Sequence, residues 1–234
     1  MHYLGVGLIR PNNLRSFYSV SCGLIKMIAI IDYGMGNIHS VQKALESFKA
    51  ETIVTNKPEI IRNCHKVVLP GVGAFDDAIQ ELKKQNLIPA LINHIKNKKP
   101  FLGICLGLQF LFEGSEEALA AKGLGVLKGK VVKFQNKKGF KVPHMGWNQL
   151  KKTSRPGTKE AICPLLKDVT DNSYVYFCHS YYPQPADRKI IAATTDYVTD
   201  FAAVVWKDNV FGVQFHPEKS QEVGLKMIKN FVEI

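Results

Sequence analysis

The 234-residue sequence lacks the features that mark membrane-spanning, disulfide-rich and disordered proteins. No apolar run approaches the roughly 20 residues that a membrane-spanning helix needs, and hydrophobic residues, 46% of the chain, recur in short blocks throughout. An odd number of cysteines without any C-x-x-C pair argues against a disulfide framework or a zinc ribbon. We therefore expect a globular protein of the reducing cytoplasm that contacts no membrane. The five cysteines are Cys22, Cys64, Cys105, Cys163 and Cys178.

Acidic residues are scarce: 20 Asp and Glu stand against 31 Lys and Arg, which leaves a formal net charge of +11. Residues 128–152 contain eight lysines and no acidic residue. A solvated lysine-rich face is the plain interpretation, and a surface for an acidic partner or a phosphorylated substrate is the alternative. Because no nucleic-acid-binding motif with interleaved aromatic residues accompanies this charge, we expect no nucleic-acid partner.

The first 26 residues differ from the rest of the chain. They contain no Asp or Glu, and a second methionine, Met27, opens the first clear strand. We expect residues 1–26 to be an N-terminal extension outside the fold, either loose or placed there by a start codon assigned too far upstream. An organellar transit peptide is the alternative, because the segment is poor in acids and contains Arg and Ser. Residues 27–234 are then expected to form one domain.

Buried apolar runs alternate with helical spacing from Met27 onward. This pattern is typical of an α/β domain with a mostly parallel central sheet flanked by helices. Helical stretches are expected up to Phe48, after Ala74, after Pro89, from Leu106 and over 221–232. The expected strands are 27–32, 51–54, 66–69, 100–104, 126–134, 174–178, 190–195, 202–206 and 210–215.

The pentapeptide Gly-Ile-Cys-Leu-Gly at 103–107 has the pattern of a nucleophile elbow, placed where a strand runs into a helix. The chain must turn sharply there, and the flanking glycines leave room for a strained central residue. A helix N-terminus favours the thiolate of Cys105, and the next backbone N–H, that of Leu106, is free to bind a developing oxyanion. A buried structural cysteine between packing glycines is the alternative.

A thiolate nucleophile needs a base, and the base needs an orienting group. His216 and Glu218 follow the strand 210–215 and are two residues apart, so their side chains can meet on one side of an extended chain. A zinc deaminase would need a P-C-x-x-C segment downstream, and no cysteine follows Cys178. The sequence therefore predicts a Cys-His-Glu triad, with a solvent-facing His/Glu pair as the alternative.

Two further segments each contain a closely spaced pair of glycines. Residues 70–73, Pro-Gly-Val-Gly, follow the strand 66–69 and form either a loop with exposed backbone N–H groups or a plain turn. Gly34 and Gly36 suggest a dinucleotide fingerprint, but His39 stands where that fingerprint requires glycine. The dinucleotide interpretation is therefore set aside.

Six segments in order resemble the motifs of class I glutamine amidotransferases, and three of them resemble more narrowly the glutaminase subunits of imidazole glycerol phosphate synthases. The narrower likeness is carried by Asp-Tyr-Gly-Met-Gly-Asn, Pro-His-Met-Gly-Trp-Asn and Tyr-Phe-Cys-His-Ser-Tyr-Tyr. The resemblance runs from Met27 to the C-terminus. The six segments are 32–37, 70–73, 100–109, 143–148, 176–182 and 216–218.

The resemblance implies roles for matching positions. Cys105 would attack the glutamine amide, His216 would transfer protons, and Glu218 would orient the imidazole. The implied oxyanion hole consists of the N–H of Leu106 and an N–H of the Gly71–Val72 peptide, which is thought to reorient in this family. The residues implied to bind glutamine are Gly73, Gln109, Glu117, His179, Ser180 and Tyr181.

The resemblance also implies a heterodimer with a (β/α)8-barrel cyclase, which receives ammonia and makes imidazole glycerol phosphate in histidine biosynthesis. Neither a metal nor an organic cofactor is expected, because the nucleophile is a side chain. A paralogous glutaminase that supplies ammonia to another synthase, for example in surface-polysaccharide amidation, is the nearest alternative. A non-enzymatic scaffold is another, and the triad residues argue against it.

Overall fold

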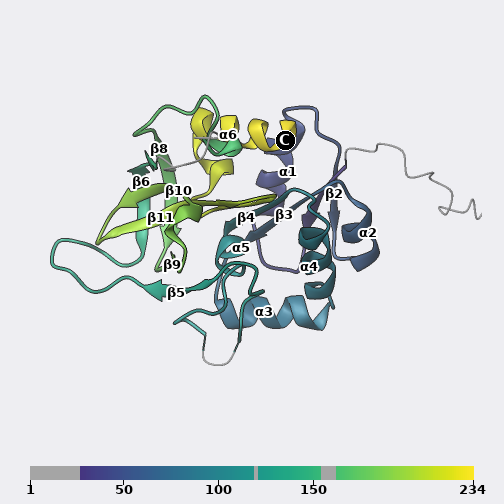
Figure 1. Ribbon diagram of the computed structural model, residues 1–234, viewed down its shortest axis with the longest axis horizontal. Helices are drawn as coiled ribbons and strands as arrows, with labels where there is room; N and C mark the ends of the chain where they lie inside the picture. Colours follow the sequence, from purple (N-terminus) through teal and green to yellow (C-terminus); the bar gives the residue numbers. More distant parts are fainter. Residues whose placement is uncertain (1–26, 119–120, 154–161) are drawn as a thin grey trace, which may run out of the picture.

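The computed structural model describes residues 27–118, 121–153 and 162–234 (Figure 1). The expected extension 1–26 lies outside the described residues. None of the helices within the described ranges has the length and apolarity that a membrane crossing requires.

An eight-stranded, mostly parallel sheet forms the centre of the fold, in the order β2-β1-β3-β4-β12-β11-β10-β7. The first five strands in this order are parallel, and the last three continue the sheet in antiparallel pairs. The expectation of a mostly parallel sheet is thus confirmed. The strands are β1 (Ile28–Ile31), β2 (Thr52–Thr55), β3 (Lys66–Gly71), β4 (Phe101–Cys105), β7 (Lys151–Lys152), β10 (Ile191–Asp196), β11 (Asp200–Lys207) and β12 (Val210–Val213).

Helices cover both faces of the sheet, as Figure 1 shows. Ile28 and Ile30 of β1 belong to the core under α1 and α6, whereas Ala29 and Ile31 belong to the core under α2, α3 and α4. A strand buried on both faces must be apolar at every position, which explains its continuous apolar run. The helices are α1 (Ile38–Glu46), α2 (Pro58–Asn63), α3 (Phe75–Lys84), α4 (Ile88–Lys96) and α6 (Gln221–Glu233).

Two short antiparallel ribbons flank the antiparallel end of the sheet. One pairs β5 (Gly129–Lys133) with β9 (Tyr181–Pro185), and the other pairs β6 (His144–Gln149) with β8 (Tyr174–His179). The second ribbon places residues 35 positions apart side by side, with His144 opposite His179.

The sequence expectation contains no helix at α2 and no strand at β6 or β9, and two further details differ. The strand expected at 51–54 as buried is β2, an edge strand whose Val54 is 36% exposed, because only β1 pairs with it. The helix expected from Leu106 is a single short turn, α5 (Leu106–Gln109).

Candidate active site

Cys105 lies where β4 meets α5, with a φ of +52° and its side chain buried in the fold. A positive φ is strained for a residue with a β-carbon and persists only where neighbouring structure holds it. Here the last β4 residue pairs with Gly71 of β3, and the backbone enters α5 directly afterwards. The predicted elbow is therefore present, and it holds Cys105 at the carboxyl end of the parallel strands.

The flanking glycines are needed for close approach of backbone to backbone. A β-carbon on Gly103 would lie 2.6 Å from the carbonyl oxygen of Gly107. A β-carbon on Gly107 would overlap the carbonyl oxygen of Leu69 on β3. Only glycine at both positions lets the first turn of α5 pack directly against β3, which brings the loop after β3 beside Cys105.

His216 and Glu218 form a buried pair in the turn after β12. The Nδ1 atom of His216 lies 2.8 Å from Oε1 of Glu218, and the two side chains are 5% and 1% exposed. Burial alone would lower the pKa of His216. Hydrogen bonds to Cys105 and Glu218, and the negative charge of both groups, outweigh it and raise that pKa to about 10. The imidazole of His216 is therefore protonated near pH 7, between the Cys105 sulfur and the Glu218 carboxylate.

The backbone around His216 is fixed by Ser220. The hydroxyl of Ser220 donates to the carbonyl of His216 at 2.7 Å and accepts from the amide of Tyr176 at 2.9 Å. The amide of His216 in turn donates to the carbonyl of Tyr176 at 2.9 Å. These bonds tie the turn to β8, so the imidazole position is set by the β6–β8 ribbon as well as by β12.

The loop after β3 lies beside the sulfur. Gly71 is the register partner of Cys105, and Val72, 41% exposed, and Gly73, with a φ of +92°, follow it. The hydroxyl of Tyr33 donates to the carbonyl of Pro70 at 3.1 Å. Burial, with the nearby Cys105, raises the pKa of Tyr33 well above its ordinary value, so the hydroxyl stays a donor.

A cavity of about 340 Å³ opens over Cys105. Its lining includes ten of the twelve site residues that the sequence predicted. The two others lie behind it, Gly71 within the sheet and the Glu218 side chain behind His216. The ten are Val72, Gly73, Cys105, Leu106, Gln109, Glu117, His179, Ser180, Tyr181 and His216.

The Tyr181 carbonyl organises one wall of the cavity. It accepts hydrogen bonds from Nε2 of Gln109 at 3.0 Å and from Nδ1 of His179 at 2.9 Å. The other nitrogen of His179, Nε2, lies 3.1 Å from Nδ1 of His144. Both nitrogens of His179 are therefore occupied, and the residue acts on the cavity through its shape and through the Tyr181 backbone.

The two histidines are held neutral. Burial lowers the pKa of His144 to about 4, and burial, reinforced by the nearby His144 and His216, lowers that of His179 to about 3. The His144 ring stacks between Phe177 and Tyr197, at centroid distances of 4.7 and 3.9 Å. The pair is a rigid support for the cavity wall and carries no charge near pH 7.

Glu117 brings a carboxylate to the opposite side of the cavity. Its Oε2 accepts from the amide of Phe75 at 3.1 Å, at the start of α3. Burial raises the pKa of Glu117, and the charges of Asp76 and Asp77 add to this effect against the lowering by the Phe75 amide. A cationic ligand group that pairs with Glu117 inside the cavity would oppose this shift and favour the ionised carboxylate.

The family description "Glutamine amidotransferase class-I" matches residues 29–234. The chain belongs to this family. Among its relatives, the imidazole glycerol phosphate synthase subunit HisH of Syntrophotalea carbinolica is 47% identical over 210 residues, which are 88% of this chain and 98% of the relative. The same subunit of Methanocaldococcus jannaschii is 47% identical over 208 residues, 89% of this chain and 100% of the relative.

Solved structures show the same class I amidotransferase fold at low sequence identity. PurLQS from Thermotoga maritima superposes with a TM-score of 0.67 at 17% identity and covers 88% of this chain and 97% of that one. A glutamine amidotransferase from the same organism gives a TM-score of 0.57 at 18% identity, covering 82% and 76% of the two chains.

Several residues of this class I amidotransferase site were not singled out from the sequence. Gln214 and Ser220 are completely buried polar residues at the site, and Gln214 reaches the Cys105 sulfur. A signal existed for Gln214, since it is the only polar residue in the apolar run 210–215. Tyr33 and His144 stand in the resembling segments 32–37 and 143–148, but nothing in those segments indicates their partners, which come from distant parts of the chain.

Proposed function

We propose that this chain is the glutaminase subunit of imidazole glycerol phosphate synthase and hydrolyses glutamine to glutamate and ammonia. The observation that carries the chemistry is that the strained Cys105 and His216 line one cavity, with Glu218 buried behind His216 and bonded to it. The relatives named above, similar over almost their whole length, support the pathway. No step of this scheme uses a metal or an organic cofactor.

In the first half of the reaction the Cys105 thiolate attacks the side-chain amide carbon of glutamine, and a C–S bond forms. Negative charge develops on the amide oxygen, where the N–H of Leu106 and an N–H of the Gly71–Val72 peptide would stabilise it. His216 donates its proton to the leaving nitrogen as the C–N bond breaks. Ammonia departs and a γ-glutamyl thioester is left on the sulfur.

In the second half, water replaces the thiolate. The now neutral His216 accepts a proton from the water as its oxygen attacks the thioester carbonyl. The C–S bond breaks, glutamate leaves, and the thiolate–imidazolium pair is restored. Glu218 keeps Nδ1 of His216 protonated throughout, so Nε2 is the nitrogen that faces the reacting atoms.

Glutamine is recognised by opposite walls of the cavity in this scheme. Glu117 pairs with the α-ammonium group, and the loop residue Gly73 and the backbone at Ser180 and Tyr181 bind the α-carboxylate. Both hydrogens of the Gln109 amide nitrogen are donated, to Tyr181 and Gln214, so its oxygen is the group left to accept from the substrate.

The partner we propose is a (β/α)8-barrel cyclase that docks over the cavity mouth and receives ammonia. Support comes from exposed apolar side chains on the outer face of the β6–β8 ribbon: Met145 is 61%, Trp147 45% and Tyr174 55% exposed. Tyr176 and Cys178 on the same ribbon line the cavity. A protein that covers this strip therefore also covers the exit of the site.

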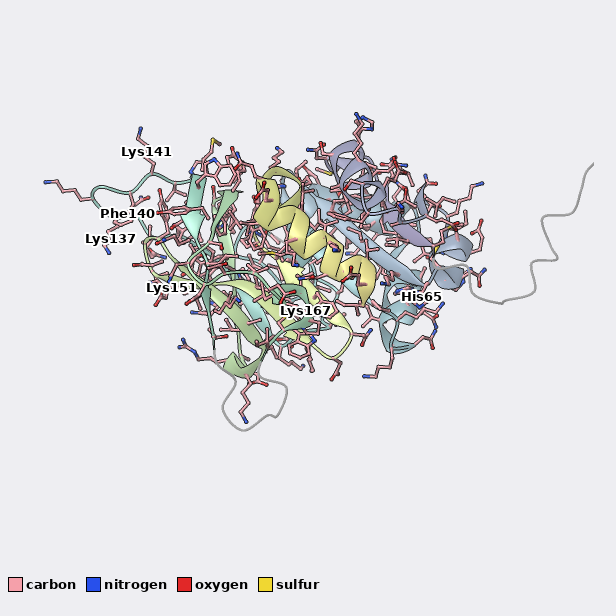
Figure 2. The ribbon with its side chains drawn as sticks, turned by 90° about the horizontal axis from the view of Figure 1, so that it is seen from above. His65, Lys137, Phe140, Lys141, Lys151 and Lys167 are labelled. Carbon is pink, nitrogen blue, oxygen red and sulfur yellow. The ribbon has the colours of Figure 1, made fainter. Side chains whose placement is uncertain are left out.

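A basic rim adjoins the strip. Figure 1 shows the connection between β5 and β6 projecting from the molecule, and Figure 2 shows Lys137, Phe140 and Lys141 on it. Nζ of Lys137 lies 5.1 Å from the centroid of the Phe140 ring, and all three side chains are exposed. Such a rim suits an acidic edge on the cyclase and speeds association at low salt.

Ammonia release from glutamine, by the purified chain alone and with the cyclase and its nucleotide substrate, tests the proposal. We expect low activity alone, a rise by orders of magnitude in the complex, and formation of imidazole glycerol phosphate with aminoimidazole-carboxamide ribonucleotide. Cys105→Ser should abolish release in both settings, and Trp147→Glu should abolish only the stimulation. Activity indifferent to the cyclase would point to the paralogous glutaminase that feeds another synthase.

A further inference from the structure

Gln214 is a fully buried amide wedged between the candidate nucleophile and a cavity wall. It follows β12 directly, and its backbone amide donates to the carbonyl of Ala203 on β11 at 2.9 Å. Its side-chain Nε2 lies 3.7 Å from the sulfur of Cys105, and its Oε1 accepts from Nε2 of Gln109 at 3.1 Å. Burying a polar side chain in an apolar strand costs folding free energy unless neighbouring groups form hydrogen bonds with it.

The direction of the Gln214 amide follows from a fixed acceptor two links away. The Tyr181 carbonyl can only accept, so the atom of Gln109 that faces it must be the amide nitrogen. That same nitrogen faces Gln214, so the facing atom of Gln214 must be its oxygen. The nitrogen of Gln214 is then the atom beside Cys105, and it donates to the sulfur.

We propose that Gln214 is a positioning residue that holds the Cys105 thiolate with its amide N–H and locks Gln109 with its amide oxygen. The proposal deepens the glutaminase function and rests on it. A donor beside the sulfur favours thiolate over thiol, because a hydrogen bond to a charged group is stronger than one to a neutral group. The oxygen of the Gln214 amide accepts from Gln109, which also donates to the Tyr181 carbonyl. The nucleophile and the cavity wall at Tyr181 are therefore positioned relative to each other by one hydrogen-bond chain.

Two substitutions separate the two roles. Gln214→Met has a similar length but neither donates to the sulfur nor accepts from Gln109. Gln214→Glu keeps an oxygen for Gln109, while its ionised carboxylate has no hydrogen to give to the sulfur. Both should move the pH midpoint of Cys105 alkylation upward: Gln214→Met because the donor is lost, and Gln214→Glu further still, because its carboxylate also repels the thiolate. Only the Met variant should also raise the KM for glutamine.

The readout is the rate of iodoacetamide alkylation of Cys105 against pH, followed on the Cys105 peptide by mass spectrometry, with kcat and KM measured alongside. Thr195→Val is the matched control: Thr195 is fully buried on β10, and its hydroxyl has no hydrogen-bond partner among the described residues. We expect its alkylation profile to superimpose on that of the unchanged chain. If Gln214→Met does not fold, Gln214→Leu, which is also neutral and has no donor, carries the same alkylation test.

An unmoved alkylation midpoint in a folded Gln214 variant overturns the proposal, as does an equal shift in Thr195→Val. The glutaminase function fails separately, if the unchanged chain alkylates normally but releases no ammonia from glutamine with the cyclase present. A shifted midpoint combined with that failure would leave Gln214 positioning a thiolate that serves another electrophile.

Discussion

Replacing Glu218 with glutamine removes one charge from the buried pair while leaving its shape. The amide oxygen of Glu218→Gln can still accept from Nδ1 of His216, so the ring stays oriented and a charge-assisted hydrogen bond becomes a neutral one. That difference is about 1–2 kcal/mol, and we expect kcat/KM for glutamine to fall by roughly 5- to 30-fold. Residual activity should persist, because Cys105 and the oxyanion-stabilising amides are untouched.

The pH profile of the same variant tests the electrostatic part. Glu218 is one of the groups that raise the pKa of His216 to about 10. Without its charge the imidazolium loses its proton at lower pH, so the alkaline limb of kcat/KM should move down by about one unit. Glu222→Gln, the same change at an exposed position on α6, should leave both the rate and the limb unchanged.

Stability provides the third measurement on Glu218→Gln. Oε2 of Glu218 is buried without a hydrogen-bond partner among the described residues, and an amide nitrogen placed there would be an unpaired donor. Thermal unfolding should therefore report a loss of about 1–3 kcal/mol in the free energy of unfolding.

A fall in kcat/KM beyond a thousandfold in a folded variant would refute this reasoning, since Glu218 would then do more than hold and polarise the imidazole. An alkaline limb that does not move would refute it equally.

Gly107→Ala should destabilise the fold by about 3 kcal/mol or more, seen in thermal unfolding, because its β-carbon would overlap the β3 carbonyl. Tyr33→Phe should lower the free energy of unfolding by about 1–2 kcal/mol, because the Pro70 carbonyl loses its donor; a change within error would show that water replaces it. His144 and His179 are buried neutral, so their contribution is complete above pH 6.5 and declines as pH falls towards 4. The free energy of unfolding, measured with urea at pH 7, 6 and 5, should fall by about 3 kcal/mol from pH 7 to pH 5. A free energy that does not change with pH would contradict the assignment of both histidines as neutral.

The central sheet and the nucleophile could be predicted because their signals are local. A strand buried on both faces is a continuous apolar run, and a strand that turns sharply into a helix needs glycine on both sides of the nucleophile. The sequence predicts a buried strand at 51–54, but β2 lies at the edge of the sheet, because edge position depends on which strands pair with it. Local pattern thus predicts the element, whereas its exposure depends on partners far along the chain.

One strand of each ribbon, β5 or β8, overlaps an expected strand, but β6, β9 and the site's polar network could not be predicted in this way. The inward positions of β6 include His144 and Asn148, so the strand shows no apolar alternation. β9 contains Pro183 and Pro185, which argue against a strand in sequence. The pairing of His144 with His179 exists only through the β6–β8 register.

The two faces of the β6–β8 ribbon serve different purposes, because alternate side chains of a strand point to opposite sides. Alternate side chains point to opposite faces, so His144 and His179 belong to the interior while Met145 and Trp147 face outward. Substitutions confined to Met145 and Trp147, which do not line the cavity, can change which protein is recognised while leaving the residues that support the chemistry in place. Duplicated copies of such a gene can therefore acquire new ammonia acceptors through successive single substitutions on the outward face of this one ribbon.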